Sequence, residues 1–312
     1  MTKLPVFKAF FAALAFLATH ALTLLKIMWL PALALLGAFA AVMPSLLDAQ
    51  MSGAAMGESP DPAAMVAAVG AMFKSMGLLY LVMAIVYPMM IAGVLKHIVR
   101  GETPKLPFYL GYAGDELRVL GAFLLVIVMT GIVYVVGVLA ILAVAVGLSA
   151  VSPAIGGVLG FVARIAFVCA FIWFLMRLSV SLPAAVGARS LGVVESWRMT
   201  KGNIWRLLLY WILFVIVLIP VVSIFMAVAM PDMMGAYGEM IAAGQDPAAQ
   251  EAVNQRLLQM QRDMWDMSKP GFWPYVIAVY VYTLVTNAVW CVAAGVAYRY
   301  LSGDAGAKTD AA

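Results

Sequence analysis

The chain has 312 residues, of which 65% are hydrophobic and 11% carry a charge, and its mean hydropathy is +1.03. A soluble domain is roughly 45–50% apolar and about 25% charged, so this composition excludes an ordinary water-soluble protein. The net charge of +4 is modest and gives no reason to expect nucleic acid as a partner. The sequence predicts an integral protein that crosses the membrane several times, with the phospholipid bilayer as its main partner.

The first 21 residues combine a basic start with an apolar run and small residues at Thr19–Ala21. This pattern is typical of a cleaved secretory signal. Similar segments with a basic edge recur deep inside the chain, which favours a retained segment at the membrane surface. We therefore expect a single membrane domain over residues 1–304, followed by a disordered cytoplasmic tail at residues 305–312.

Six stretches are long and apolar enough to span a bilayer, which requires about 20 apolar residues in a helix. They are Ile27–Met43, Met76–Leu95, Leu117–Leu148, Ile155–Met176, Trp205–Met230 and Trp273–Tyr298. The sequence therefore predicts an all-α fold, a polytopic membrane bundle of six transmembrane helices. Residues 117–182 are the ambiguous part, because this length suits either two long tilted spans or three ordinary ones.

The distribution of basic residues decides between these two counts, because cytoplasmic segments of membrane proteins are enriched in Lys and Arg. With six spans and both termini inside, 14 of the 19 basic residues lie in cytoplasmic segments. A seventh span within residues 117–182 would export the basic cluster between Arg189 and Arg206. We therefore expect six spans, two cytoplasmic termini and a location in the bacterial inner membrane.

Three segments share one pattern, in which an interfacial stretch ends in a basic residue and an outward span follows. The three basic residues are Lys26, Arg118 and Arg206. The first and third units also share Met-Pro at the start of the outer loop and Asp-Pro-Ala-Ala within it. The pattern predicts three helical hairpin repeats with interfacial cytoplasmic helices. The expected repeat units are residues 7–100, 104–182 and 188–300, and the expected outer loops are residues 44–75 and 231–272.

The stretch from Ser181 to Leu208 reads SLPAAVGARSLGVVESWRMTKGNIWRLL. It resembles the signature of membrane domains found beside glycerophosphodiester phosphodiesterase catalytic domains, and of stand-alone bacterial inner-membrane proteins of the same six-helix type. The resemblance is carried by Pro183-Ala184, Ser196-Trp197-Arg198, Thr200, Gly202-Asn203 and Trp205-Arg206. It implies the six-helix fold and brings no catalytic residue, because no hydrophilic phosphodiesterase domain follows Tyr298.

We interpret this stretch first as an anchor at the membrane surface. Leu191, Val194 and Trp197 recur at a spacing of three, which predicts a lipid-facing stripe on a short helix. Gly202 can end that helix, and Asn203 can cap the next one. The alternative is a site for a lipid headgroup or a partner protein. The candidate residues for that site are Arg198, Lys201, Trp205, Arg206, Arg118 and Lys26.

Charged residues at the inner ends of other spans have a simpler interpretation. Asp115 and Glu116 lie within one helical turn of Arg118, so we expect this acidic pair to be neutralised locally. Lys96 and Arg177 lie at cytoplasmic ends of spans, where anchoring in the interface explains them.

Polar residues inside spans are candidates for function by default. Arg164 lies in the outer half of the fourth span, where it can pair with an outer acid, hold an anionic group or reach the interface. Thr283, Thr286 and Asn287 form a polar patch near the middle of the sixth span. Such a patch either makes hydrogen bonds between helices or lines a cavity.

No cofactor or metal is expected. The chain has two cysteines and two histidines, Cys169, Cys291, His20 and His97. They are far apart in the sequence and lack metal-ligand spacing. The 22 methionines invite a Cu(I) interpretation, because thioethers suit that ion. Their clusters at residues 230–240 and 260–267 contain no His or Cys, so we interpret them as flexible apolar side chains.

Two functions are compatible with these patterns. No GxSxG, HExxH, Walker or GxGxxG motif is present, so we expect a non-enzymatic membrane protein. It would be a lipid- or partner-binding scaffold or regulator of the cell envelope, with a membrane protein or a second copy as its partner. The alternative is a transporter or lipid-handling permease with a site near Arg164 and Asn287. That alternative predicts a cavity between repeats, whereas a scaffold predicts exposed patches large enough for a partner.

Overall fold

The computed structural model describes residues 2–55, 62–102, 114–149, 152–244 and 246–303. Within these residues the chain is all-α and contains no strand, as the sequence predicts. The expected tail at residues 305–312 lies outside the described residues. The same holds for residues 104–113, where the middle repeat is expected to begin, and for Asp61 of the first Asp-Pro-Ala-Ala.

Six helices are long and apolar enough to cross a membrane, and each overlaps one of the six predicted stretches. The candidate spans are Ala21–Met51, Met76–Arg100, Gly114–Val144, Gly156–Gly187, Ile204–Ala229 and Phe272–Ser302. The helices are α1 (Val6–Thr19), α2 (Ala21–Ala55), α3 (Pro62–Arg100), α4 (Gly114–Ser149), α5 (Pro153–Leu178), α6 (Ser181–Gly187), α7 (Val193–Met199), α8 (Ile204–Ala229), α9 (Pro231–Ala243), α10 (Pro247–Met264) and α11 (Phe272–Ser302).

A single helix start divides the ambiguous region into two spans. Ser152 has extended backbone angles, and Pro153 occupies the first turn of α5. Proline suits this position because its missing N–H would have no partner there and its fixed φ matches the helix. α4 continues without a break for 36 residues before this point. The prediction of two long spans in residues 117–182 is therefore confirmed.

Much of the first predicted outer loop is helical. α2 continues through Pro44 to Ala55, and α3 already begins at Pro62, so most of residues 44–75 is helical. The segment is rich in Ala and Met, which favour helix. α2 continues through Pro44, as it does through Pro31. The second outer segment contains α9 and α10.

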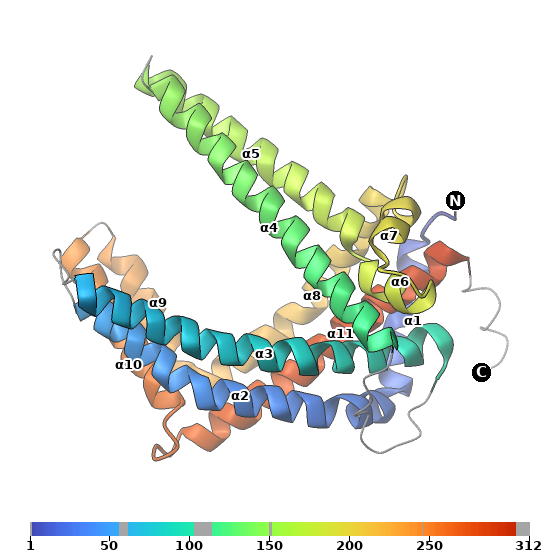
Figure 1. Ribbon diagram of the computed structural model, residues 1–312, viewed down its shortest axis with the longest axis horizontal. Coiled ribbons are helices and arrows are strands. Elements are labelled where there is room, and N and C mark those ends of the chain that lie inside the picture. The colour runs from blue at the N-terminus through green and yellow to red at the C-terminus, as the bar shows by residue number, and fades with distance from the viewer. Residues whose placement is uncertain (1, 56–61, 103–113, 150–151, 245, 304–312) are drawn as a thin grey trace.

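The main body of the protein is a bundle of α2, α3, α8 and α11, on which α1 packs (Figure 1). Its core is continuous and includes large fully buried side chains such as Tyr210 and Phe214. The Phe214 ring meets Phe10 of α1 edge to face, with ring centroids 5.1 Å apart. The Tyr210 hydroxyl donates a hydrogen bond of 2.8 Å to the backbone oxygen of Ala293. α1 is therefore part of the folded core.

The α4–α5 hairpin diverges from this bundle, and Figure 1 shows it pointing away from α3 and α8. No residue in the most apolar window of α4 is buried, and only 11% of that of α5 is. The two helices pack closely on each other, because Gly137 leaves room for the Phe167 ring where any Cβ would clash. Beyond its base, this hairpin has lipid as its natural surroundings.

A network of buried ion pairs joins the hairpin to the bundle. Lys96 Nζ of α3 lies 2.6 Å from Glu116 Oε1 of α4. Arg100 Nη1 lies 2.7 Å from Asp115 Oδ2, and a second Arg100 nitrogen donates to the backbone oxygen of Val186 in α6. Arg118 also pairs with Asp115, at 2.7 Å, so local neutralisation holds for that acid. The prediction of a local partner is wrong for Glu116, which pairs with Lys96 of α3. Lys96 is therefore a buried ion-pair partner rather than a surface anchor.

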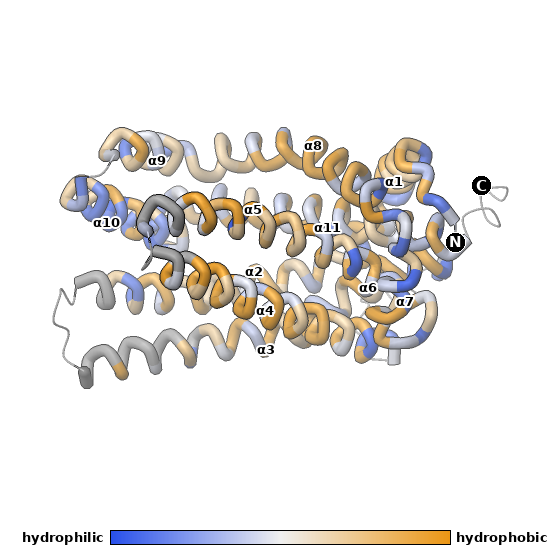
Figure 2. Tube along the Cα trace, turned by 90° about the horizontal axis from the view of Figure 1, so that it is seen from above, coloured by the Kyte–Doolittle hydropathy of each residue, from blue (hydrophilic) through white to orange (hydrophobic). Residues whose placement is uncertain are grey.

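The end of the bundle opposite the chain termini is covered by α9 and α10. Asp246 caps α10, because its carboxylate accepts hydrogen bonds from the backbone N–H groups of Ala248 and Ala249. Arg262 of α10 pairs with Asp48 of α2 at 2.7 Å. Figure 2 shows an apolar middle band between more polar ends, one at α10 and one at α6 and α7. This is the distribution expected of a protein that spans a membrane.

Candidate functional site

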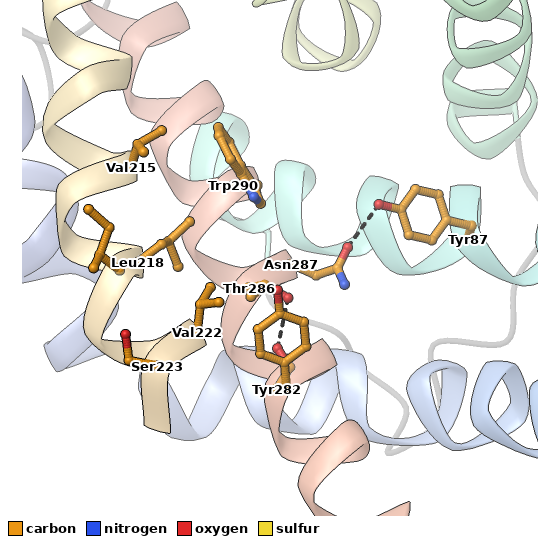
Figure 3. A pocket seen from close by; sticks show the side chains of 10 residues that line it. Tyr87, Val215, Leu218, Val222, Ser223, Tyr282, Thr286, Asn287 and Trp290 are labelled. Carbon is orange, nitrogen blue, oxygen red and sulfur yellow. Dashed lines mark hydrogen bonds between the residues drawn. The ribbon is translucent and has the colours of Figure 1, made fainter. Parts of the chain in front are cut away.

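A cavity of about 540 Å³ lies among α3, α8 and α11 (Figure 3). It is lined by Tyr87, Val215, Leu218, Ile219, Val222, Ser223, Tyr282, Thr286, Asn287 and Trp290. Asn287 lies halfway along α11, and Tyr87 and Leu218 lie near the middles of α3 and α8. The cavity is therefore at mid-depth in the membrane, where water is scarce.

Hydrogen bonds hold the polar side of the cavity in place. The Tyr87 hydroxyl donates to Asn287 Oδ1 at 2.8 Å, which links α3 to α11. Asn287 Nδ2 donates to the backbone oxygen of Thr283 at 2.8 Å. Thr286 Oγ1 donates to the backbone oxygen of Tyr282 at 2.7 Å. These bonds orient the Asn287 amide, and one of its two N–H groups has no partner among the described residues.

Two further donors at the cavity have no hydrogen-bond partner within the described part of the chain. They are Ser223 Oγ on α8 and Trp290 Nε1 on α11. In the hydrocarbon region a polar group without a partner is unfavourable by about 1–3 kcal/mol. Val215, Leu218 and Val222 supply an apolar wall beside these donors (Figure 3). The site thus combines an apolar surface with unpaired hydrogen-bond donors.

Among the described residues, those that line the cavity include no Asp, Glu, Lys, Arg or His. The sequence predicts a shared site for Arg164 and Asn287. Arg164 lies exposed on α5 and is not among the lining residues. Thr283 contributes a backbone oxygen to Asn287 rather than a side chain to the lining. Of the four predicted intramembrane residues, Thr286 and Asn287 line the cavity. Tyr87 and Ser223 were missed, because a lone Tyr or Ser in an apolar span carries no periodic signal.

The predicted headgroup or partner residues differ in their exposure and in their contacts. Arg198, Lys201, Trp205 and Lys26 are exposed. Arg206 is also exposed, and it donates a 3.3 Å hydrogen bond to the backbone oxygen of Leu4. Arg118 belongs to the ion-pair network, through Asp115. Their exposure at the terminal end of the bundle is consistent with a membrane-surface anchor.

The buried polar residues of the Ser181–Leu208 stretch fix local structure. Ser196 Oγ donates to the backbone oxygen of Arg177 at 2.7 Å, and Thr200 Oγ1 donates to Ser196 at 2.8 Å. The Arg177 guanidinium lies 5.1 Å from the Trp173 ring centroid and 5.2 Å from that of Trp197. α7 is therefore tied to the end of α5, while Val194 and Trp197 remain exposed as the stripe predicts.

Asn203 has a different role from the predicted helix cap. Its side chain makes no capping bond to α8. Instead Asn203 Oδ1 accepts from the Leu4 N–H at 3.0 Å, and Nδ2 donates to the backbone oxygen of Thr2 at 3.1 Å. The Thr2 hydroxyl donates in turn to the backbone oxygen of Leu301 at 2.6 Å. Asn203 thus holds the N-terminal segment against the bundle, next to the end of α11.

The two histidines also come together, although they are 77 positions apart in the chain. The His20 ring stacks on Phe16 at 4.1 Å and lies 5.1 Å from the His97 ring. Among the described residues, no group of three or more His, Cys, Asp or Glu is arranged to hold a metal ion. Both cysteines are free, with Cys169 exposed and Cys291 buried.

The chain was compared with protein-family models, with curated proteins and with solved structures, and none of them matches. No relative therefore supplies a function or a functional residue, and the cavity at Asn287 is judged by its own geometry.

Proposed function

We propose that this protein is a non-enzymatic lipid-binding protein of the bacterial inner membrane, and that the cavity at Asn287 holds an uncharged amphiphile. The observation that carries the proposal is the set of unpaired donors of Asn287, Ser223 and Trp290 at mid-depth. A ligand that accepts hydrogen bonds and brings an apolar chain satisfies both sides of the cavity. Of the two functions derived from the sequence, this geometry favours the lipid-handling one.

The lining argues for a neutral ligand over a charged one. A phosphate or carboxylate group at mid-depth would need a basic partner, because burying an unpaired charge in hydrocarbon is strongly unfavourable. The lining residues supply none. Hydroxyl and ester oxygens need only hydrogen-bond donors. Diacylglycerols and long-chain alcohols have this chemistry.

A second candidate function is supported by the exposure of the α4–α5 hairpin. Its apolar faces run the length of two spans with little contact to the bundle. A membrane protein or a second copy that packs on this hairpin would make the chain a scaffold. The resemblance of the Ser181–Leu208 stretch to membrane domains beside glycerophosphodiester phosphodiesterase domains is compatible with either function.

Native mass spectrometry of the purified protein tests the lipid proposal. We expect a bound neutral amphiphile when the protein is reconstituted with diacylglycerol, and much weaker retention of phosphatidylglycerol. Asn287→Leu removes the oriented amide while keeping a similar volume, and it should lower retention of diacylglycerol at least tenfold. Thr130→Val is the matched control, because it removes a polar group from the middle of α4, away from the cavity lining.

Equal retention by the wild type and Asn287→Leu would contradict the proposal, and so would a preference for the anionic lipid. If Asn287→Leu lowers stability through loss of the Tyr87 bond, Ser223→Ala provides a second variant. Ser223 makes no hydrogen bond within the described residues, so its loss should change ligand retention without changing the fold.

The orientation in the membrane is also part of the proposal, and it rests on the basic segments near both termini. Single cysteines at Lys201 and Gln255, introduced into a chain whose own cysteines are replaced, place probes at opposite ends of the bundle. In intact cells an impermeant thiol reagent should label the probe at Gln255 and spare the one at Lys201. Labelling of the probe at Lys201 alone would show that the orientation is the opposite of the proposed one.

A further inference from the structure

A second cavity, of about 370 Å³, lies at the end of the bundle opposite the chain termini. It is formed where α8 ends, where α9 and α10 pack together, and where α11 begins. It is separate from the cavity at Asn287, since the two share no lining residue.

Four methionines line this second cavity, although the sequence places them in two separate clusters. Met230 immediately precedes α9, Met233 lies in the first turn of α9, and Met260 and Met264 come from α10, one helical turn apart. The spacing in α10 puts Met260 and Met264 on one face of that helix. Met230, Met260 and Met264 pack around the buried Met233. The fold therefore gathers four thioethers around one space.

Four thioether sulfurs together are selective for soft cations. Thioether sulfur is a soft, neutral ligand that favours Cu(I) over the hard cations Mg²⁺ and Ca²⁺, which prefer oxygen. A methionine side chain has three rotatable bonds, so sulfur atoms that line one cavity can converge on an ion. From the sequence, the lack of His and Cys in the two clusters favours packing residues. Four thioether sulfurs that meet at one cavity can bind Cu(I) without a His or Cys ligand.

Charged groups at the cavity complement a single positive charge. Asp232 and Asp263 both line it, and the Lys269 ammonium lies 4.0 Å from the Asp263 carboxylate. With Lys269 offsetting one acid, the rim carries one net negative charge. That charge attracts a monovalent cation to a site whose inner ligands are neutral.

We propose that this cavity binds a soft monovalent cation, Cu(I) or its redox-inert analogue Ag(I), through Met230, Met233, Met260 and Met264. The proposal does not depend on the lipid site, and it places the metal at the membrane surface opposite the chain termini. The sulfur atoms act as the ligands, and Asp232 draws the ion toward them.

Competition with a chromophoric Cu(I) chelator under reducing conditions tests the proposal on the full-length protein in detergent. We expect one equivalent of Cu(I) to be withdrawn from the chelator. Met233→Leu/Met260→Leu keeps the size of two side chains and removes one sulfur from each pair, so it should weaken binding at least tenfold. Met28→Leu/Met90→Leu is the matched control, since it removes two buried sulfurs from the core at the other side of the bundle.

Failure to withdraw Cu(I), or equal weakening by both double variants, would overturn the proposal. Titration of ¹³C-methyl-methionine protein with Ag(I) gives a readout that requires no variant. Four methyl resonances should shift together at one equivalent, and those of Met28 and Met90 should not. Displacement of Cu(I) by Ca²⁺ would instead identify a carboxylate site at Asp232 and Asp263, which contradicts thioether ligation.

Discussion

Lys96 and Glu116 form a buried ion pair of 2.6 Å at the point where the α4–α5 hairpin joins the bundle. Their side chains are 8% and 1% exposed, so both charges have lost most of their water. Such a pair is stable only while each charge keeps its partner. The pair holds α3 and α4 together at the base from which the two helices diverge.

Glu116→Gln should therefore destabilise the protein strongly, because the buried Lys96 ammonium loses its partner at 2.6 Å and keeps only Asp115, at 3.7 Å, which Arg100 and Arg118 already share. Breaking a buried pair from one side costs about 3–5 kcal/mol. The measurement is unfolding by denaturant in detergent micelles. Glu239→Gln breaks the exposed pair with Arg256 and should cost less than about 1 kcal/mol. Equal losses of stability in the two variants would show that burial does not increase the contribution of the Lys96–Glu116 pair.

Arg177→Lys tests the packing of the guanidinium between Trp173 and Trp197. Lysine keeps the charge but lacks the planar group that stacks on both rings, so we expect a loss of about 1–2 kcal/mol. Tryptophan fluorescence should also change, because two indoles lose their neighbour. Arg198→Lys, at an exposed position on α7, serves as the control and should leave both stability and fluorescence unchanged.

Asn203→Ala should release the N-terminal segment. Both Asn203 bonds, to the Leu4 N–H and to the Thr2 oxygen, are lost together, and a buried N–H is left without its acceptor. We expect faster hydrogen exchange at residues 2–5 and earlier cleavage by protease, while the six spans keep their protection. Asn254→Ala, at an exposed position on α10, should not alter exchange at the N-terminus. Unchanged exchange in Asn203→Ala would mean that other contacts hold this segment.

Gly192→Ala and Gly202→Ala differ in one structural respect and should have unequal effects. Both glycines have a positive φ, of 72° and 80°, which is unfavourable for alanine by about 1 kcal/mol. At Gly192 a Cβ would also collide with backbone atoms of Ser181 and Ala185, whereas the space around Gly202 is open. We expect little folded protein from Gly192→Ala and a moderate loss of thermal stability in Gly202→Ala. Similar yields of the two variants would contradict the close contact between α6 and the start of α7.

The sequence by itself determined the class of protein and the six apolar stretches, which depend on local properties, and the distribution of basic residues along the whole chain decided the number of spans. A helix in hydrocarbon must satisfy its backbone within its own segment, so length and apolarity suffice to identify it. Pro153 marks the turn between α4 and α5 for the same local reason. The exposed face of α7 also followed from the spacing of Leu191, Val194 and Trp197.

Only the tertiary structure decided which polar residues meet. Glu116 pairs with Lys96 rather than with its neighbour in sequence, and Asn203 binds the N-terminal segment rather than its own helix. Asn287 faces a cavity with Tyr87, while Arg164 lies on the other hairpin. Such partners come from segments about 200 positions apart, as with Tyr87 and Asn287. Their meeting depends on how whole helices are packed, and this information is not contained in any local pattern of the chain.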